Sequence, residues 1–374
     1  MKIFFDHKIF VNQNYGGPSR YITSLVDQLN NNKNINARIF APFHINNYLS
    51  KLHQKKINPS FKLPFSDQIN KFYKVKKKLM LANGLINKYI FKKFNPDILH
   101  TTYYDDDFFP NNKKIVLTVH DLIHEIFRAD YGFKKSYLPK RKMIDRADHI
   151  ICVSESTKID LINYYNVPDN KITVIYHSSP FENDEKQTYK MDINILNEKY
   201  FLYVGSRWKY KNFSNLLKTL KFNTSILKNY KLVLFGGGRI TNSEINQIKK
   251  LDLNIDNIIH FSGNEKLLKN LYRHAEFLIY PSKYEGFGIP VLESFSQECP
   301  VICSNTSSLP EVAGDAALYF DPNDVSSISD SITKITSSEE IKRIYIQKGL
   351  KRLQSFSWEK CANETINVYN NLLY

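Results

Sequence analysis

Short apolar runs of strand length recur along this chain, and longer stretches of helical pattern separate them. Six runs lie in the first half and six in the second: KIFFDH, ARIFAP, DILHTTYY, KIVLTVHD, DHIICVS and KITVIYH, then FLYVGS, KLVLFGGG, NIIHFSG, EFLIYPS, PVICSN and ALYFDP. Continuous β-rich runs that alternate with helices are typical of parallel sheets covered on both faces. The 374 residues exceed what one hydrophobic core usually holds. The repeated pattern therefore predicts two Rossmann-like, doubly wound α/β domains that face each other across a cleft.

The domain boundaries follow from this repeat. We expect an amino-terminal domain at 1–178 and a carboxy-terminal domain at 200–355, joined by a polar linker with a short helix at 179–199. An amphipathic helix is predicted at 356–374, with its start at Ser357. In open parallel sheets ligands bind beyond the carboxyl ends of the strands, so the residues that follow each strand are the candidates for function.

The charge of the chain favours an anionic partner. The formal net charge is +15, and the region from Lys51 to Asn95 carries 12 lysines against one acid, Asp67. Its lysines are interleaved with Phe, Tyr, Leu and Ile, which predicts one or two basic amphipathic helices. Peripheral contact with an anionic membrane and a merely solvated lysine face are both compatible with this pattern. We expect no nucleic-acid partner, because the region lacks the glycine and aromatic fingerprint of RNA-binding domains.

The remaining composition is typical of an intracellular globular protein. The four cysteines form no CxxC pair and no metal spacing, and they suit a reducing cytosol. No apolar run reaches the roughly 18 residues of a membrane-spanning helix. The segment MKIFFDHKIF is too short and too charged for a signal peptide, and we expect it to form the first strand. The expected location is the cytoplasm, with peripheral contact at the inner face of the membrane as a hypothesis.

The stretch YPSKYEGFGIPVLESF combines glycines, a proline and two spaced carboxylates after a predicted strand. Pro290 is favourable in a first helical turn, so a helix is predicted to begin near Ile289. The backbone N–H groups just before this helix can then bind an anion. Glu285 and Glu293 cannot favourably contact a phosphate, but they can accept hydrogen bonds from hydroxyls. An anion site flanked by two such acids predicts a nucleotide-sugar site; two capping glutamates would explain only Glu293.

Three other loops add weaker signals. Arg207 and Lys211 follow FLYVGS and suit a diphosphate, although this pair taken alone is better interpreted as two surface cations. Gly16 and Gly17 are expected just before a helix, where backbone can approach phosphates; a plain tight turn is the alternative. The glycines of LFGGGR fit close approach of the backbone to a ligand or to a neighbouring loop.

Taken together, these segments resemble the retaining enzymes of glycosyltransferase family 4, which have the GT-B fold. The resemblance covers nearly the whole chain and rests on YGGPSRYI, TVHDLIHEIF, ADHIICVSESTKIDLINYYNVPDNKITVIYHS, YVGSRWKYKNFSNLL, PSKYEGFGIPVLES and SLPEVAGDAALYFDP. PSKYEGFGIPVLES looks like the E-x7-E region of that family. The terminal FSWEK fits a last helix that, in similar enzymes, packs back on the first domain.

The resemblance implies a role for each matching position. Arg207 and Lys211 would hold the donor diphosphate and stabilise it as the leaving group. Glu285 would contact hydroxyls of the transferred sugar, and His120 would reach the same sugar. Glu293 would hold the ribose. The remaining donor contacts would be the glycines of the first domain and the backbone amides of the second-domain loop: Gly16, Gly17, Gly286, Phe287, Gly288 and Ile289.

The resemblance also implies the reaction. Similar enzymes retain the anomeric configuration, and the leaving phosphate takes the proton of the acceptor hydroxyl; no metal and no cofactor are expected. DDD at 105–107 is superficially like the metal-binding DxD of the other glycosyltransferase fold, but in this loop we interpret it as polar surface. The expected donor is GDP-mannose, ahead of a UDP-hexose. The expected acceptor is a glycan or lipid-linked glycan of surface polysaccharide assembly.

Two other classes of function remain open at this point. A phosphorylase would need a pyridoxal-binding lysine that the sequence does not indicate, and a nucleotide-sugar epimerase would lack the glutamate loop with Arg207 and Lys211 upstream. A lectin-like or basic-surface binding module without transferase activity would release no nucleotide from any sugar donor.

Overall fold

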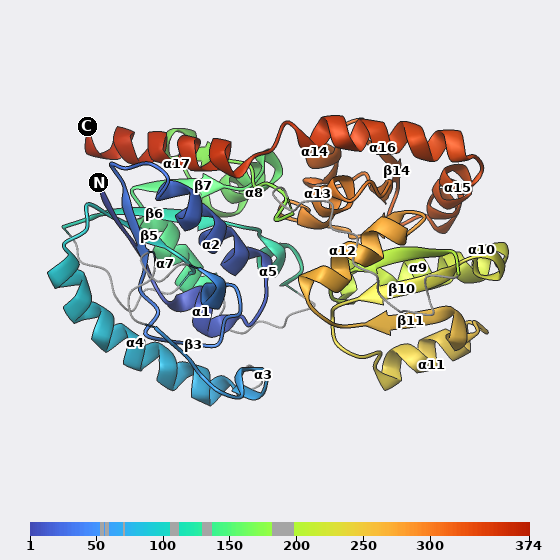
Figure 1. Ribbon diagram of the computed structural model, residues 1–374, viewed down its shortest axis with the longest axis horizontal. Helices are drawn as coiled ribbons and strands as arrows, with labels where there is room; N and C mark the ends of the chain where they lie inside the picture. Colours follow the sequence, from blue (N-terminus) through green and yellow to red (C-terminus); the bar gives the residue numbers. More distant parts are fainter. Residues whose placement is uncertain (53–55, 57–59, 70–71, 105–111, 129–136, 182–197) are drawn as a thin grey trace. The chain divides into compact units, whose positions relative to one another are not determined.

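The computed structural model describes residues 1–52, 56, 60–69, 72–104, 112–128, 137–181 and 198–374 (Figure 1). Its contacts divide the chain into two compact units. Unit 1 comprises Met1–His177 together with Ser357–Tyr374, and unit 2 comprises Ser178–Phe356. Most of the segment expected as a linker, and DDD at 105–107, lie outside the described residues.

Unit 1 contains a six-stranded parallel sheet in the order β2-β1-β5-β6-β7-β8. Five of the six apolar runs predicted as strands in the first half contain one of these strands, and β2 begins one residue before the run ARIFAP. Their bounds are β1 Lys2–Phe5, β2 Asn36–Ile39, β5 Ile98–Thr101, β6 Lys114–Val119, β7 His149–Cys152 and β8 Ile172–Val174.

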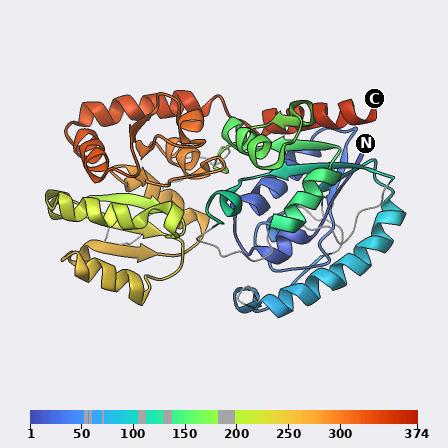
Figure 2. The same cartoon turned by 180° about the vertical axis from the view of Figure 1, so that it is seen from behind.

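Helices cover both faces of this sheet. Alternate strand residues point to opposite sides, and both sides are apolar, so each face needs cover. Ile3 and Phe5 pack in one apolar cluster with α1 (Lys8–Asn12), α2 (Gly17–Leu29) and α17 (Trp358–Leu373). Phe4 belongs to a second cluster with α4 (Tyr73–Phe94), α7 (Tyr137–Arg146) and α8 (Glu155–Tyr165). Figure 2 shows unit 1 from behind, with α7 and α8 in green. The carboxy-terminal helix is thus part of the core of unit 1.

Unit 2 contains a second six-stranded parallel sheet, in the order β11-β10-β9-β12-β13-β14. The strands again coincide with the predicted runs: β9 Tyr200–Val204, β10 Lys231–Phe235, β11 Ile258–Phe261, β12 Leu278–Tyr280, β13 Val301–Ser304 and β14 Ala317–Phe320. The chain winds outward from β9 to β11 and then returns to β12 on the other side of β9. This reversal is the topological switch point of a doubly wound sheet, where ligands usually bind.

The helices of unit 2 also lie on both sides of its sheet. One apolar cluster joins the strands to α9 (Phe213–Phe222), α10 (Ser225–Asn229), α11 (Asn242–Lys250) and α15 (Val325–Thr336). The others are α12 (Glu265–His274), α13 (Ile289–Ser296), α14 (Leu309–Ala313) and α16 (Glu339–Leu353). Short 3-10 helices occur in both units: η5 Lys209–Lys211 and η6 Ile255–Asn257 in unit 2, and η1 Leu49–Lys51 and η3 Asp169–Lys171 in unit 1.

Some elements of unit 1 were not expected from the sequence. β3 (Phe43–His44) and β4 (Phe61–Lys62) form a small parallel pair, and α5 (Ile123–Ile126) is a single turn. α3 (Ser66–Ile69) is also a single turn, but it lies in the basic region, where helices were expected. The basic region does form helices, of which α4 is the long one. Within the described ranges, no helix is both long and apolar enough to cross a bilayer.

A buried polar network connects α17 to the sheet. The Nδ1 atom of His100 lies 2.6 Å from the hydroxyl of Tyr369, and its Nε2 atom lies 2.8 Å from the hydroxyl of Thr118. Thr118 in turn lies 3.3 Å from the hydroxyl of Tyr21 on α2. Because every one of these groups is buried, each needs its partner, and the network fixes the position of the last helix.

We expect His100 to destabilise the protein as the pH falls below about 6.5. Burial lowers the pKa of its imidazole from 6.5 to about 3. Between these two values the unfolded chain binds a proton that the folded chain does not. The free energy of unfolding should therefore fall by about 1.4 kcal/mol per pH unit on account of this group.

Replacing His100 by glutamine should flatten this dependence. The measurement is denaturant unfolding at several pH values between about 6.5 and 4. Only the slope with pH is compared, so the cost of altered hydrogen bonds, which is present at every pH, cancels. An unchanged slope in the variant would contradict the assignment.

Candidate functional site

The switch point of unit 2 collects most of the residues predicted for the donor site. β9 and β12 are neighbours in the sheet, with Leu202 opposite Leu278. Arg207 and Lys211 follow β9, and the glutamate loop at 285–288 follows β12. Segments far apart in the sequence are therefore brought to the same edge of the sheet.

Lys211 and Glu285 form an ion pair at this edge. The ammonium of Lys211 lies 2.6 Å from a carboxylate oxygen of Glu285, and the two side chains are only 13% and 9% exposed. Lys211 also donates to the hydroxyl of Tyr280, 3.3 Å away. Burial, followed by the negative charge of Glu285, raises the pKa of Tyr280 well above its usual value. The phenol therefore stays protonated, and the group can offer a cation, a carboxylate and a hydroxyl to a bound ligand.

The glutamate loop is held by the serines that follow β13. The backbone N–H of Glu285 donates to the hydroxyl of Ser307, and the hydroxyl of Ser308 lies 2.9 Å from the carbonyls of both Glu285 and Phe287. Gly288 has a φ of 107°, and a Cβ there would approach a methyl group of Leu309 to 2.9 Å. A glycine is required at this position for both reasons. The helix that follows begins at Ile289 with Pro290 in its first turn, as predicted.

Arg207 is buried against the glycine loop after β10. Its guanidinium pairs with Glu244 at 2.6 Å and donates to the carbonyls of Gly236, Gly238 and Arg239. The side chain is only 3% exposed. Its contact with a diphosphate stays a prediction, and what the structure establishes is that Arg207 fixes this loop.

The glycines of LFGGGR allow close approach of a neighbouring loop. Gly236, Gly237 and Gly238 all have positive φ, and a Cβ on Gly237 would approach the carbonyl oxygen of Gly205 to 2.7 Å. Sequence reasoning left open whether a ligand or a loop approaches here. The structure places the loop after β9 against these glycines, beside Arg207.

Glu293 lies on α13, with its side chain buried in unit 2. It accepts a hydrogen bond of 3.0 Å from the hydroxyl of Tyr272 on α12. The predicted contact of Glu293 with a ribose is not tested by this geometry and stays a prediction.

In unit 1, the predicted glycines lie at the start of α2. Gly16 is the cap residue, and Gly17 is the first residue of the helix rather than part of the preceding loop. The helix extends one residue further than expected because Pro18 is favourable in a first turn. The carbonyl of Gly16 accepts from the hydroxyl of Ser19 at 3.1 Å.

His120 follows β6 and packs edge-on against Tyr21, with ring centroids 5.3 Å apart. Burial, and then the charge of Lys140, lowers the pKa of His120 to about 3, so the ring is neutral at physiological pH. Its Nε2 atom is buried and has no hydrogen-bond partner among the residues that the structure describes. A buried ring nitrogen without a partner can bind a hydroxyl of a ligand.

Sequence reasoning missed the residues that hold the segment after His120. Lys140 donates to the carbonyl of Asp121 at 2.7 Å and pairs with Glu125 at 3.1 Å, and both charged side chains are almost fully buried. The hydroxyl of Tyr165 donates to the other oxygen of Glu125. Moving this segment would leave buried charges without their partners, which is strongly destabilising. The contacts of Lys140 therefore fix the conformation of 121–125.

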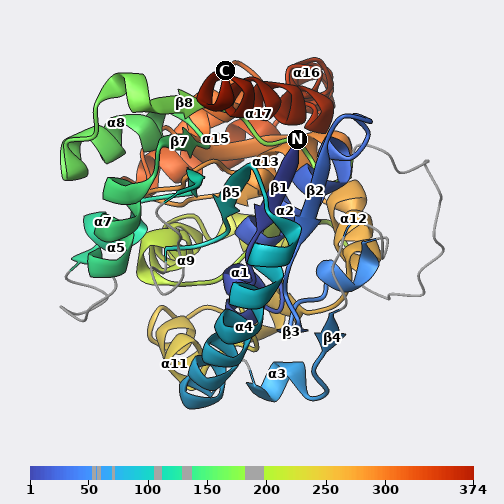
Figure 3. The same cartoon turned by 90° about the vertical axis from the view of Figure 1, so that its left-hand side faces the viewer.

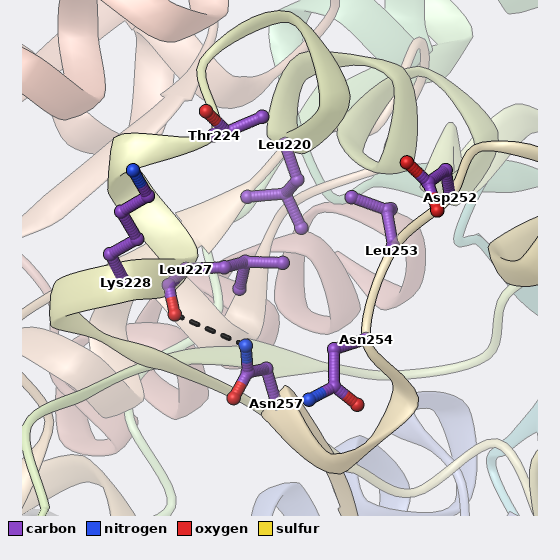
Figure 4. A pocket seen from close by; sticks show the side chains of 8 residues that line it. All are labelled: Leu220, Thr224, Leu227, Lys228, Asp252, Leu253, Asn254 and Asn257. Atoms are coloured by element: carbon purple, nitrogen blue, oxygen red, sulfur yellow. Dashed lines mark hydrogen bonds between the residues drawn. The ribbon is translucent and has the colours of Figure 1, made fainter.

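A small cavity of about 150 Å³ lies elsewhere in unit 2 (Figure 4). It is lined by residues near the amino ends of β10 and β11, the opposite edge of the sheet from the switch point: Leu220, Thr224, Leu227, Lys228, Asp252, Leu253, Asn254 and Asn257. The amide of Asn257 donates to the carbonyl of Leu227 beside it. None of the predicted site residues contributes to this cavity.

Comparison with known proteins bears on both units. Residues 185–352 match the family model described as Glycosyl transferases group 1, and residues 15–178 match the model described as Glycosyltransferase Family 4. The O-antigen chain mannosyltransferase B of Escherichia coli is 33% identical over 275 residues, which are 70% of this chain and 71% of that protein. The O-antigen chain mannosyltransferase RfbU of Salmonella typhimurium is 32% identical over 64% of this chain and 65% of its own.

Solved structures share the fold at low sequence identity. The sucrose-phosphate synthase of Thermosynechococcus elongatus has a TM-score of 0.75 at 17% identity, covering 99% of this chain and 98% of its own. WaaG, a glycosyltransferase involved in lipopolysaccharide biosynthesis, has a TM-score of 0.71 at 13% identity over 99% of both chains. The two parallel α/β units therefore form the predicted GT-B fold.

Proposed function

Since the chain belongs to the glycosyltransferases of family 4 and group 1 and is itself a glycosyltransferase, we propose that it moves a hexose from a nucleotide-diphosphate sugar to a glycan or lipid-linked glycan in surface polysaccharide biosynthesis. The observation that carries this proposal is the group formed by Lys211, Glu285 and the start of α13 at the switch point of unit 2. There, cationic and hydroxyl-accepting groups lie beside one helix start.

The proposed chemistry follows from charge. Breaking the bond between the sugar and the diphosphate places negative charge on the leaving group. A preplaced cation and backbone amides stabilise that charge without reorganising, which is usually the largest electrostatic contribution to catalysis. Lys211 supplies the cation at the glutamate loop, and Arg207 supplies positive charge at the glycine loop. Glu285 orients the transferred sugar by accepting from its hydroxyls.

In unit 1, His120 is proposed to contact the transferred sugar. Its ring is neutral, and its buried Nε2 atom has no partner within the described part of the chain, so the ring suits a hydroxyl better than a phosphate. The start of α2 at Gly16 and Gly17 is proposed to approach the donor phosphates, because a helix amino terminus favours negative charge.

We propose further that the reaction retains the anomeric configuration and needs neither metal nor cofactor. Lys211, Arg207 and the backbone amides at the start of α13 are proposed to stabilise the diphosphate together, in the place of a divalent cation. The leaving phosphate can then accept the proton of the attacking hydroxyl, so a separate base is not required.

GDP-mannose is the proposed donor, with a UDP-hexose as the second candidate. The support comes from relatives, since the two O-antigen proteins described above are named mannosyltransferases. A lipid-linked acceptor would place the enzyme at the cytoplasmic face of a membrane, with the basic region from Lys51 to Asn95 as the part in contact with it.

The proposal is tested by nucleoside diphosphate release from a panel of donors: GDP-mannose, GDP-fucose, UDP-glucose, UDP-galactose and UDP-N-acetylglucosamine. We expect slow release from one donor even without acceptor, because water can replace the acceptor hydroxyl. The preferred donor should be GDP-mannose, and adding a chelator should leave its rate unchanged.

Each outcome has a distinct meaning. Release from a UDP-sugar alone would overturn the donor assignment but keep the transferase. Release from no donor, together with no thermal stabilisation by GDP or UDP, would favour a binding module without transferase activity. A rate that falls with the chelator and returns with a divalent cation would overturn metal independence.

A further inference from the structure

In its middle, the long helix α4 presents polar residues to the protein and apolar residues to the outside. Asn83 and Asn87 are buried, at 0% and 1% exposure. The side chain of Asn83 both accepts from and donates to the backbone of Phe43, and Asn87 donates to the carbonyl of Phe40. The middle of the helix is therefore held by amide hydrogen bonds, where an ordinary surface helix would use apolar side chains.

The opposite side of α4 carries a row of exposed apolar residues. Leu81, Leu85 and Tyr89 are four positions apart, so they adjoin one another on the helix, and they are 56%, 68% and 71% exposed. Figure 3 shows α4 on the outside of unit 1, with α3 at one end. Near its amino end, Phe65, Phe72 and Tyr73 are also mostly exposed. Contiguous apolar surface of this kind marks an interaction site more often than scattered single residues do.

Lysines flank this apolar row. α4 has seven lysines and no acid, and six of the lysines are exposed: Lys74, Lys77, Lys78, Lys88, Lys92 and Lys93. The seventh, Lys76, turns inward and donates to the carbonyl of Asn12, and burial lowers its pKa. Long lysine side chains can keep their charge in the headgroup layer while apolar neighbours insert below it.

We propose that the outer face of α4, defined by Leu81, Leu85 and Tyr89 with their flanking lysines, docks on the surface of an anionic lipid bilayer. The negative charge of such a bilayer complements the lysines of α4, whereas a second copy of the chain would bring the same positive charge against this face. The inference depends on the proposed function only for its setting, since lipid binding needs neither donor nor acceptor.

The test is sedimentation of the full chain with vesicles of phosphatidylcholine, and with vesicles in which about a third of this lipid is replaced by phosphatidylglycerol. We expect at least about tenfold stronger binding to the anionic vesicles, decreasing as salt is added. Changing Leu81, Leu85 and Tyr89 together to serine should weaken that binding by about tenfold or more. Changing Lys74, Lys78 and Lys92 together to glutamine should do the same.

Two matched controls keep the test specific. Ile159→Ser with Tyr164→Ser removes exposed apolar residues from α8 of the same unit, and Lys228, Lys249 and Lys250 changed to glutamine remove three exposed charges from unit 2. Both control variants should bind like the unchanged protein. Equal loss in the controls, or binding that ignores the anionic lipid, would overturn the proposal.

Two further measurements distinguish lipid docking from a role of the same face in catalysis or in dimer formation. Donor turnover and thermal unfolding of the serine variant should match those of the unchanged protein, because α4 carries no residue of the proposed donor site. If nucleotide release fails while vesicle binding persists, the proposed function is wrong and the docking surface stands. If size-exclusion chromatography shows a dimer that the serine variant dissociates, with no vesicle binding, the face is a dimer interface and the lipid proposal is wrong.

Discussion

Replacing Lys211 by alanine should reduce nucleoside diphosphate release from the preferred donor by at least about tenfold. The variant loses the cation that is proposed to stabilise the leaving diphosphate. It also leaves the carboxylate of Glu285, 2.6 Å away in the native protein, without its partner. A negative charge freed at this position opposes the charge that develops in the reaction, so both effects act in the same direction.

A double-mutant cycle separates the two effects. Glu285→Ala alone should also lower the rate by at least about tenfold, because the sugar loses its hydroxyl acceptor. If the pair had only a structural role, removing both charges would restore stability and rate together. We expect the double variant to regain thermal stability relative to the single variants but to remain at least as slow as the slower one. Unchanged rates in either single variant would remove that residue from the proposed site.

Arg207→Ala should have the largest effect, a loss of about a hundredfold in release rate. The guanidinium donates to three carbonyls of the glycine loop and pairs with Glu244, so its removal leaves several acceptors without partners. The glycine loop after β10 would lose its support at the same time as the site loses a positive charge. Steady-state release from the preferred donor measures the result, and circular dichroism checks that the fold is kept.

Two conservative variants distinguish the roles of Arg207. Arg207→Lys keeps the charge but not the fork of donors, so it should recover part of the rate if the charge acts on the diphosphate. A rate as low as that of alanine would instead assign Arg207 to positioning the loop. Glu244→Gln retains an acceptor for Arg207 and for the cap of α11, and it should cost much less than Arg207→Ala.

The strands could be predicted because buried parallel strands consist of continuous apolar, β-branched and aromatic residues. KLVLF and KIVLTV show this clearly, and the structure contains β10 and β6 at those positions. The start of α13 could be predicted for a different reason, since Pro290 suits only the first turn of a helix. The short β3 and β4 lack such a signal, because two residues show no periodicity.

The pairings within the site could not be predicted from the sequence. Lys211 and Glu285 are 74 positions apart, and Arg207 and Glu244 are 37 apart, so each pair depends on how two loops meet at the edge of the sheet. One local signal did exist: Thr241 and Glu244 form a capping box at the start of α11, directly after the glycine loop. That motif would have placed a carboxylate beside the glycine loop, although not the arginine that pairs with it.

The orientation of α4 was also beyond the sequence pattern. Its lysines predicted a basic helix, but hydrophobic periodicity would turn Leu81 and Leu85 inward. Asn83 and Asn87 determine the opposite orientation. Asn83 hydrogen-bonds to the backbone of Phe43 in β3, and Asn87 donates to the carbonyl of Phe40, which directly follows β2. Specific polar contacts of this kind override an average hydrophobic preference.

The carboxy-terminal helix has a consequence for the order in which the two units can mature during translation. Residues 178–356, which make up unit 2, are synthesised before Ser357–Tyr374, which belong to unit 1. Leu25 and Leu29 of α2 share a cluster with Trp358 and Tyr369, so part of the first core has no cover until the last helix emerges. Unit 2 is therefore synthesised in full before the helix that completes the core of unit 1.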